Sequence, residues 1–202
     1  FAWGVQMAAA LAALFTYLYC RRLGLGRVAS AVGGWTFACS GFFASHIRAG
    51  HLPLLEAYPA LPLLLWVTEV NLQSLPGDRR SGLKLLAGAV ASCCVALAGH
   101  PQIPIYSLLT VGLYIVWRGR SRKGAALAAA MLLGIGLGSL SLYPMLLLVY
   151  RSTRVLALDQ PLNDVAFPYG RLSAFLFPWQ DGWPATVSMP WPQGFTTGYP
   201  EP

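Results

Sequence analysis

Three histidines and their polar neighbours fall in two short stretches between apolar segments. The stretch 45–56 carries two histidines, an arginine and a glutamate, and the stretch 99–102 carries a histidine and a glutamine. Imidazole, guanidinium and amide groups donate hydrogen bonds to phosphate oxygens, so these side chains suit an anionic group such as a lipid-linked phosphate. The candidate binding residues are His46, Arg48, His51, Glu56, His100 and Gln102.

A structural role for the same residues stays open. If the chain is helical from Pro53 onward, Glu56 lies about one turn inside an apolar segment, where an ionised group is costly unless it is paired. Arg48 or His51 is then its natural partner, in a salt bridge that fixes a hairpin. Metal binding is the weaker interpretation, because His46 and His51 have no carboxylate at the usual ligand spacing. We identify no cofactor in the sequence.

The elements that must position these residues are apolar. Of the 202 residues, 56% are hydrophobic and 10% are charged, whereas an average soluble domain is about 25% charged. The mean hydropathy is +0.55. This composition excludes an ordinary soluble enzyme and an intrinsically disordered chain. Six apolar segments, each near the roughly 20 residues that a membrane-spanning helix needs, run over residues 1–19, 28–45, 54–71, 83–99, 102–117 and 125–150. We therefore predict an all-α integral membrane protein.

Two details of these segments carry further expectations. Only Gly99, His100 and Pro101 separate the fourth segment from the fifth, which leaves a tight hairpin of two helices or one Pro-broken helix as alternatives. Small residues four apart, in the stripes 30–38 and 134–138, suit close helix packing. If the chain lacks further helices of a larger protein, we expect the Gly134–Gly138 face to be left unpacked.

The basic residues predict the orientation in a membrane. Ten of the 14 Lys and Arg residues lie in or beside three alternate connections, 20–27, 72–83 and 118–124. By the positive-inside rule these connections are cytoplasmic, and the opposite ends of the segments are outside. The run at 118–123 either holds anionic lipid headgroups or only sets the topology. The formal net charge of +7 therefore indicates the lipid bilayer as partner, and no nucleic acid.

The composition changes after residue 150. Residues 151–202 hold over half of the 15 prolines and three of the seven tryptophans. Tryptophan favours the membrane interface, so we divide the chain into a helical membrane region, 1–150, and an extracytoplasmic loop region, 151–202. A short interfacial helix is expected over 171–178.

The order of motifs along the chain resembles a known family. Ser-Gly-Phe-Phe at 40–43 precedes His46 and the Gly-His pair at 50–51, and Ala-Gly-His-Pro-Gln follows at 98–102. This order resembles the YfhO-type bacterial membrane proteins, relatives of the polytopic GT-C glycosyltransferases. The resemblance implies a fragment of a larger GT-C-like helical bundle in the bacterial cytoplasmic (inner) membrane. It implies an enzyme that moves a sugar from a polyprenyl-phosphate carrier to an acceptor at the outer face.

The resemblance names no catalytic residue in this sequence. GT-C enzymes carry their catalytic acidic residue in the first outer loop, which is expected to precede Phe1. Two other functions stay open: a transporter or flippase for a lipid-linked or small polar substrate, and a non-catalytic envelope membrane protein. The ionisable residues gather at the two faces, which counts against transport, because transporters carry such residues near the bilayer midplane.

Overall fold

The structure is a computed structural model that describes residues 2–48, 50–75, 77–98, 102–118, 122–141, 143–144, 147 and 150–151. The side chains of Arg48 and Ser141 are outside this description. The chain divides into two units, residues 1–146 and residues 147–202. Apart from Arg151, the loop region that we expect over 151–202, with its helix at 171–178, lies outside the described residues.

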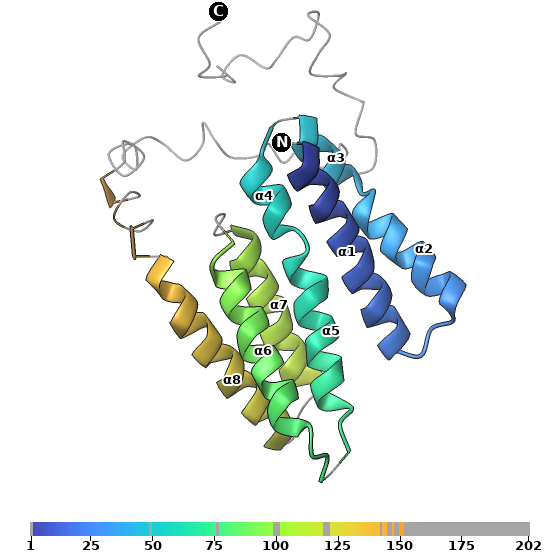
Figure 1. Cartoon of the computed structure of the whole chain (residues 1–202), viewed down its shortest axis with the longest axis vertical. Helices are drawn as coiled ribbons and strands as arrows, with labels where there is room; N and C mark the ends of the chain where they lie inside the picture. Colours follow the sequence, from blue (N-terminus) through green and yellow to red (C-terminus); the bar gives the residue numbers. More distant parts are fainter. Residues whose placement is uncertain are drawn as a thin grey trace, which may run out of the picture. The chain divides into compact units, whose positions relative to one another are not determined.

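The described elements of the first unit are all helical, so the predicted all-α class is confirmed (Figure 1). They are α1 (Ala2–Arg22), α2 (Arg27–Ala38), α3 (Gly41–Arg48), α4 (Leu52–Ala57), α5 (Ala60–Leu72), α6 (Ser81–Ala96), α7 (Gln102–Arg118), α8 (Arg122–Gly138) and the 3₁₀ turn η1 (Ser139–Ser141).

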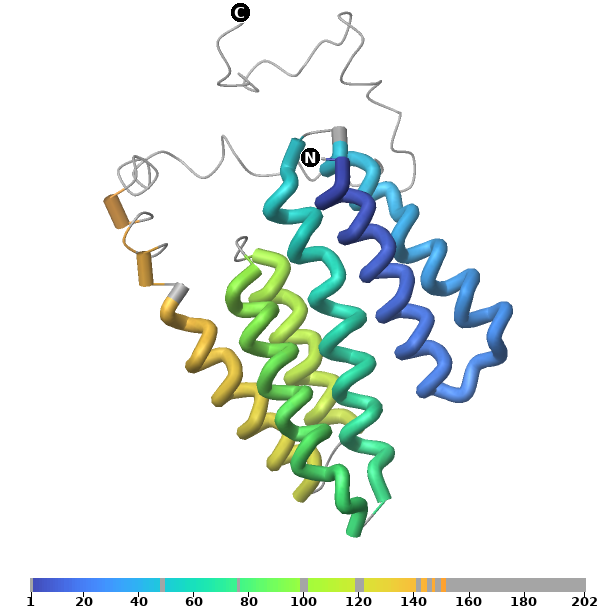
Figure 2. The backbone as a smooth tube through the Cα atoms, in the orientation of Figure 1, coloured from blue at the N-terminus to red at the C-terminus, as the bar shows by residue number. Residues whose placement is uncertain are grey.

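The long helices form an antiparallel bundle. Helix α1 packs against α2 and α5, α5 packs against α6 and α7, and α6 packs most extensively against α8. Figure 2 shows the chain passing up and down between two ends. One end, which we call the basic end, holds the connections α1–α2 and α5–α6 and the junction of α7 with α8. The other, which we call the histidine end, holds α3 and α4.

Two of the predicted segments are broken helices. The segment 28–45 is divided into α2 and α3, because the Ser40 hydroxyl accepts the Phe43 N–H (3.2 Å) and caps a new helix. The segment 54–71 is divided into α4 and α5, because Pro59 has no N–H group to continue the helix.

One side chain connects the two breaks. The hydroxyl of Tyr58 donates to the Phe37 carbonyl at the end of α2 (3.0 Å) and lies 2.8 Å from the Ser40 hydroxyl. The Tyr58 ring stacks on Phe37 with 4.6 Å between centroids, and Phe43 packs at 5.2 Å. The breaks therefore lie side by side, and Tyr58 adds a second hydrogen bond to the Phe37 carbonyl, which also accepts from the Ser40 N–H (3.3 Å).

The other segments differ less from expectation. Helices α6 and α7 are separate and contact each other, which corresponds to the hairpin of the two alternatives for 83–117. The last segment, expected over 125–150, begins at Arg122 and ends its α-helix at Gly138, followed by η1.

By length and composition, α1 is the one helix of the described residues that could cross a membrane. Helix α6 is apolar but has only 16 residues, fewer than the 18 that such a span requires. The six spans therefore stay a prediction.

Glycines allow two helix pairs to touch through their backbones. A Cβ atom at Gly34 of α2 would lie 2.6 Å from the Ala13 carbonyl oxygen of α1. On α8, a Cβ at Gly134 would collide with the Ala89 carbonyl of α6, and one at Gly138 would lie 2.9 Å from the Cys93 carbonyl. The expectation that the Gly134–Gly138 face is left unpacked is wrong, because α6 of the same chain covers it.

Candidate functional site

The turn between α3 and α4 brings two of the predicted histidines together. Gly50 adopts φ +70°, a left-handed conformation that glycine accepts without strain, and the His51 N–H donates to the His46 carbonyl (3.1 Å). The two imidazole rings lie 5.5 Å apart between centroids. His51 is exposed and His46 is half-buried.

Hydrogen bonding fixes which nitrogen of His46 is available. Its Nδ1 lies 2.7 Å from the Phe42 carbonyl oxygen, and the ring packs on Phe42 at 4.2 Å. A carbonyl only accepts hydrogen bonds, so Nδ1 carries the proton and donates. The Nε2 atom of His46 is therefore left for a ligand: it accepts in the neutral ring and donates in the charged one.

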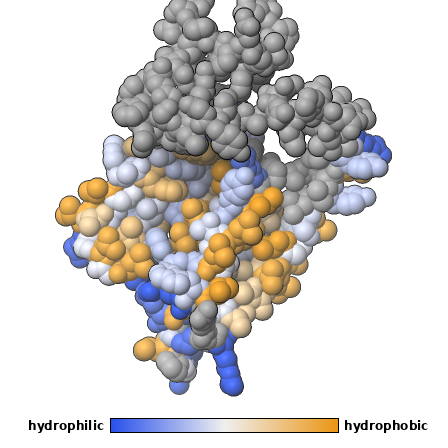
Figure 3. Space-filling model, turned by 180° about the vertical axis from the view of Figure 1, so that it is seen from behind, coloured by the Kyte–Doolittle hydropathy of each residue, from blue (hydrophilic) through white to orange (hydrophobic). Residues whose placement is uncertain are grey.

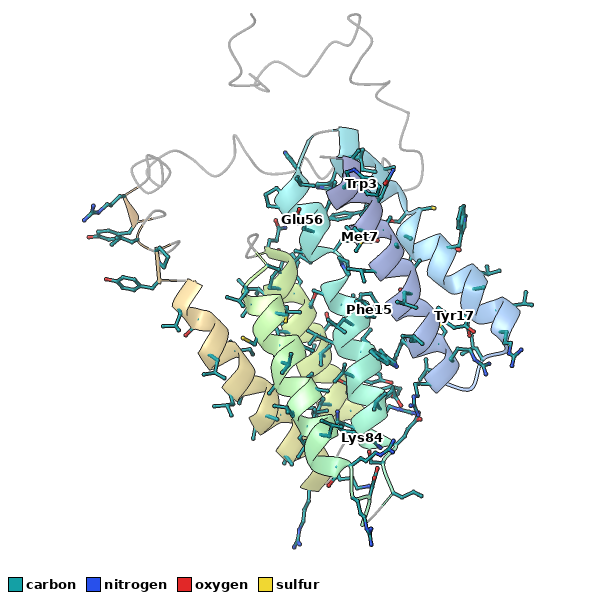
Figure 4. The ribbon with its side chains drawn as sticks, in the orientation of Figure 1. Trp3, Met7, Phe15, Tyr17, Glu56 and Lys84 are labelled. Carbon is teal, nitrogen blue, oxygen red and sulfur yellow. The ribbon has the colours of Figure 1, made fainter. Side chains whose placement is uncertain are left out.

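Glu56 lies on α4 at the same end and faces the first turn of α1 (Figure 4). Its Oε1 atom is 3.1 Å from the place that a Cβ on Gly4 would occupy, and the side chain is exposed. Between described side chains, no ion pair joins Glu56 to His51. The other expected partner, the Arg48 side chain, lies outside the description.

The second predicted turn is described in part. Gln102 is the first residue of α7 and is exposed, and α7 contacts α4. His100 lies outside the described residues. The structure thus places His46, His51 and Glu56 at one end of the bundle.

This arrangement is suited to hydrogen bonding with a polar head group. The imidazoles can donate to phosphate oxygens, and an exposed carboxylate can accept from sugar hydroxyl groups. Three or more metal-ligating side chains do not gather anywhere in the part of the chain that is described.

The most extensive polar network lies at the basic end, where the sequence interpretation placed no site. Glu69 in the last turn of α5 is fully buried. Its Oε1 accepts hydrogen bonds from the Tyr114 hydroxyl and from Arg118 Nε (2.5 Å), and its Oε2 accepts from Gln73 Nε2 (2.7 Å). Arg118 Nη2 approaches Oε2 at 3.4 Å.

The network also includes α1. Gln73 Nε2 donates to the Arg22 carbonyl (2.8 Å), and the Tyr19 ring meets Tyr114 edge-on at 6.4 Å. Both oxygens of Glu69 are occupied by donors, so this carboxylate has no free position for a substrate. Through Gln73 the network joins α1, α5 and α7. The sequence signal for this network was Glu69 itself, an ionisable residue two positions before Asn71 within an apolar segment.

A second cluster of polar side chains stabilises the connection between α5 and α6. Lys84 Nζ lies 2.7 Å from Asp78 Oδ2 and 2.8 Å from the Ser74 hydroxyl, and Lys123 of α8 donates to the Ser74 carbonyl. The bond from Lys84, together with the Arg80 N–H (2.8 Å), holds the pKa of Asp78 below its ordinary value of 3.8. Lys84 lies at the opposite end from Glu56 (Figure 4).

The chain was compared with protein-family models, with curated protein sequences and with solved structures. None of the three comparisons gives a match.

Proposed function

We propose that this chain is a six-pass membrane protein of the YfhO type whose histidine end binds the phosphate and sugar of a polyprenyl-linked donor. The observation that carries the membrane location is the exposure of large apolar side chains on the outer faces of the helices. Soluble monomers rarely expose contiguous apolar patches beyond a few hundred Å².

These exposed residues follow helical stripes. On α6, Leu83, Leu86 and Val90 are each more than half exposed, and on α7 the same holds for Leu109, Leu113 and Val116. In Figure 3, hydrophobic side chains cover much of the visible described face, and hydrophilic ones gather at its lower end. A hydrocarbon environment removes the cost of such exposure.

Helix lengths support the same location once the breaks are counted. The hydrocarbon core is about 30 Å thick and needs roughly 20 helical residues. Helices α2 and α3 have 12 and 8 residues, and α4 and α5 have 6 and 13. Each broken pair together is therefore long enough, while α7 and α8, with 17 residues each, reach about 26 Å.

Orientation supports the substrate class. At the basic end, helices begin or end with arginines: Arg21, Arg22, Arg80, Arg118 and Arg122. The positive-inside rule therefore predicts that the histidine end lies outside. Polyprenyl-phosphate-linked sugars are used at that face by the family that the motifs resemble. The available Nε2 of His46, the exposed His51 ring and the Glu56 carboxylate provide donors and an acceptor for such a head group.

Labelling of single cysteines tests the orientation. In a variant with Ala at Cys20, Cys39, Cys93 and Cys94, we expect Ala44→Cys of α3 to react with an impermeant maleimide on intact bacterial cells. Leu75→Cys, at the basic end, should react only after permeabilisation. The reverse pattern would overturn the orientation.

Binding of a radiolabelled polyprenyl-phosphate sugar to the purified full-length protein tests the site. Hydrogen bonds to charged groups are worth about 1.5–3 kcal/mol, so His51→Ala and His46→Ala should each raise Kd about 10-fold or more. Arg79→Ala, an exposed change at the basic end, is the control. Unchanged Kd in His46→Ala, His51→Ala and Glu56→Ala would refute the site, and so would a wild-type protein that does not bind.

One observation favours the transporter or flippase as a second candidate. Transporters bind substrates where helices are discontinuous, and the adjacent breaks at Ser40 and Tyr58 have this character. Proteoliposomes can distinguish the two: movement of a fluorescent polyprenyl phosphate between leaflets without sugar transfer would favour the flippase. We would then expect Tyr58→Phe to change the rate of movement.

A further inference from the structure

An apolar groove lies between α7 and α8 and has no role in the proposed sugar site. It encloses about 560 Å³. Its lining side chains are all aliphatic or thioether, and its middle is formed by Leu109, Gly112 and Leu113 of α7 and by Met131 and Leu132 of α8. The groove exists because α8 packs closely on α6 and touches α7 much less.

The groove opens on the surface that we assign to the bilayer. Leu109, Leu113 and Leu132 line it and are exposed by 62%, 72% and 67%. Gly112 leaves it wide at one level, because a Cβ there would meet no atom within 4 Å. A flexible hydrocarbon chain fits such a surface, since every contact available to it is apolar.

One end of the groove reaches cationic groups. Ile115 lines the groove, and Arg118 follows three positions later on neighbouring helix surface. Arg118 uses Nε and Nη2 on Glu69, and its side chain is still 41% exposed. Arg122 begins α8, is exposed, and lies about 9 Å along the axis before Ala128 of the lining.

We propose that this groove holds an acyl chain of an anionic phospholipid of the cytoplasmic leaflet, with its phosphate at Arg118 and Arg122. Charge complementarity carries the choice of occupant, because an anionic head group is attracted to basic residues at the membrane surface. A neutral apolar helix would offer no anion to Arg122 or to the part of the Arg118 guanidinium that stays exposed beside Glu69. The inference rests on the membrane location in the proposed function.

Native mass spectrometry of the purified full-length protein tests the inference with two lipids, phosphatidylglycerol and phosphatidylethanolamine. We expect the wild type to retain the anionic lipid at several times the level of the zwitterionic one. Gly112→Phe fills the groove and should lower retention of phosphatidylglycerol at least 5-fold. Arg122→Gln should lower the preference for phosphatidylglycerol and leave retention of phosphatidylethanolamine unchanged.

Gly136→Phe is the matched control. Gly136 is also an exposed glycine in a helix, a Cβ there also meets nothing within 4 Å, and it does not line the groove. Leu109→Trp provides a second obstruction if Gly112→Phe fails to fold. Equal retention of both lipids, or equal retention by the Gly112→Phe and Gly136→Phe variants, would overturn the inference.

Two further measurements separate the causes of failure. If alkaline carbonate extracts the protein from membranes, the membrane location itself is wrong; if the protein stays in the membrane without lipid preference, only the lipid site is wrong. A disulfide-linked dimer of Leu109→Cys in the cysteine-free background would indicate a second copy in the groove and would also overturn the inference.

Discussion

Arg118 Nε lies 2.5 Å from Glu69 Oε1, and this ion pair joins the last residue of α7 to the last turn of α5. The carboxylate is fully buried and the guanidinium is partly exposed. Tyr114 and Gln73 supply the remaining donors, so the negative charge is compensated where it would otherwise be costly. The pair is therefore a structural connection at the basic end of the bundle.

Removing the arginine alone should destabilise the protein. Loss of one partner leaves the buried Glu69 charge uncompensated and destabilises the fold, and the effect of Arg118→Gln is reduced because water reaches this guanidinium. The double variant Glu69→Gln/Arg118→Gln should lose less than the sum of the single variants. Denaturant unfolding in detergent measures these free energies. Arg79→Gln is the control, and an Arg118→Gln protein as stable as Arg79→Gln would contradict the prediction.

The sequence predicts the helical class and the close packing of small residues, since both depend on local composition. It does not predict the Glu69 network, because Tyr114 and Arg118 lie 45 and 49 positions away. Only the folded bundle brings these residues to one end. An apolar segment with Glu69, Asn71 and Gln73 near its end signals a polar contact but cannot name the partner.

The helix breaks were missed for a related reason. Hydropathy over a window does not distinguish a continuous helix from two helices joined by a short turn, so the predicted segments run across Ser40 and Pro59. Pro59 is a helix breaker and could have indicated the second break. The hydrogen bond between Ser40 and Tyr58 connects residues 18 positions apart. Among the candidate site residues, His46 and His51 are close because only a short turn separates them.

The Tyr58 hydroxyl should stabilise the junction of the two breaks. Tyr58→Phe keeps the stacking on Phe37 and removes the hydrogen bonds to the Phe37 carbonyl and to Ser40. We expect a loss of about 1–2 kcal/mol in the free energy of unfolding, because the two hydrogen bonds of a partly buried hydroxyl are lost. Tyr106→Phe, at a tyrosine with 58% exposure, should change the free energy by less than about 0.5 kcal/mol. Equal effects of the two variants would argue against the junction.

Substituting alanine for two different glycines of α8 should change the stability of the protein in opposite directions. Gly134→Ala places a methyl group against the Ala89 carbonyl of α6, so the helices must separate, and overpacking of this kind costs about 1–3 kcal/mol. Gly136 faces open space, and alanine there should be neutral or stabilise the helix by up to about 1 kcal/mol. Thermal unfolding in detergent should show a lower Tm for the first variant and an equal or higher Tm for the second. Equal Tm values would mean that α6 and α8 are not in backbone contact.

The ion pair between Asp78 and Lys84 should make part of the stability depend on pH. Its hydrogen bonds to Lys84 and to the Arg80 N–H lower the pKa of Asp78 in the folded protein below the ordinary 3.8. The ionised form is thus favoured by folding, so this stabilisation is present above pH 3.8 and is lost as the pH falls through the lower, folded value. Asp78→Asn should therefore be less stable than the wild type at pH 6, and the difference should shrink below pH 3.8. Lys84→Gln should remove the same dependence, and a stability difference between wild type and Asp78→Asn that stays constant from pH 6 to pH 2 would show that the pair does not form.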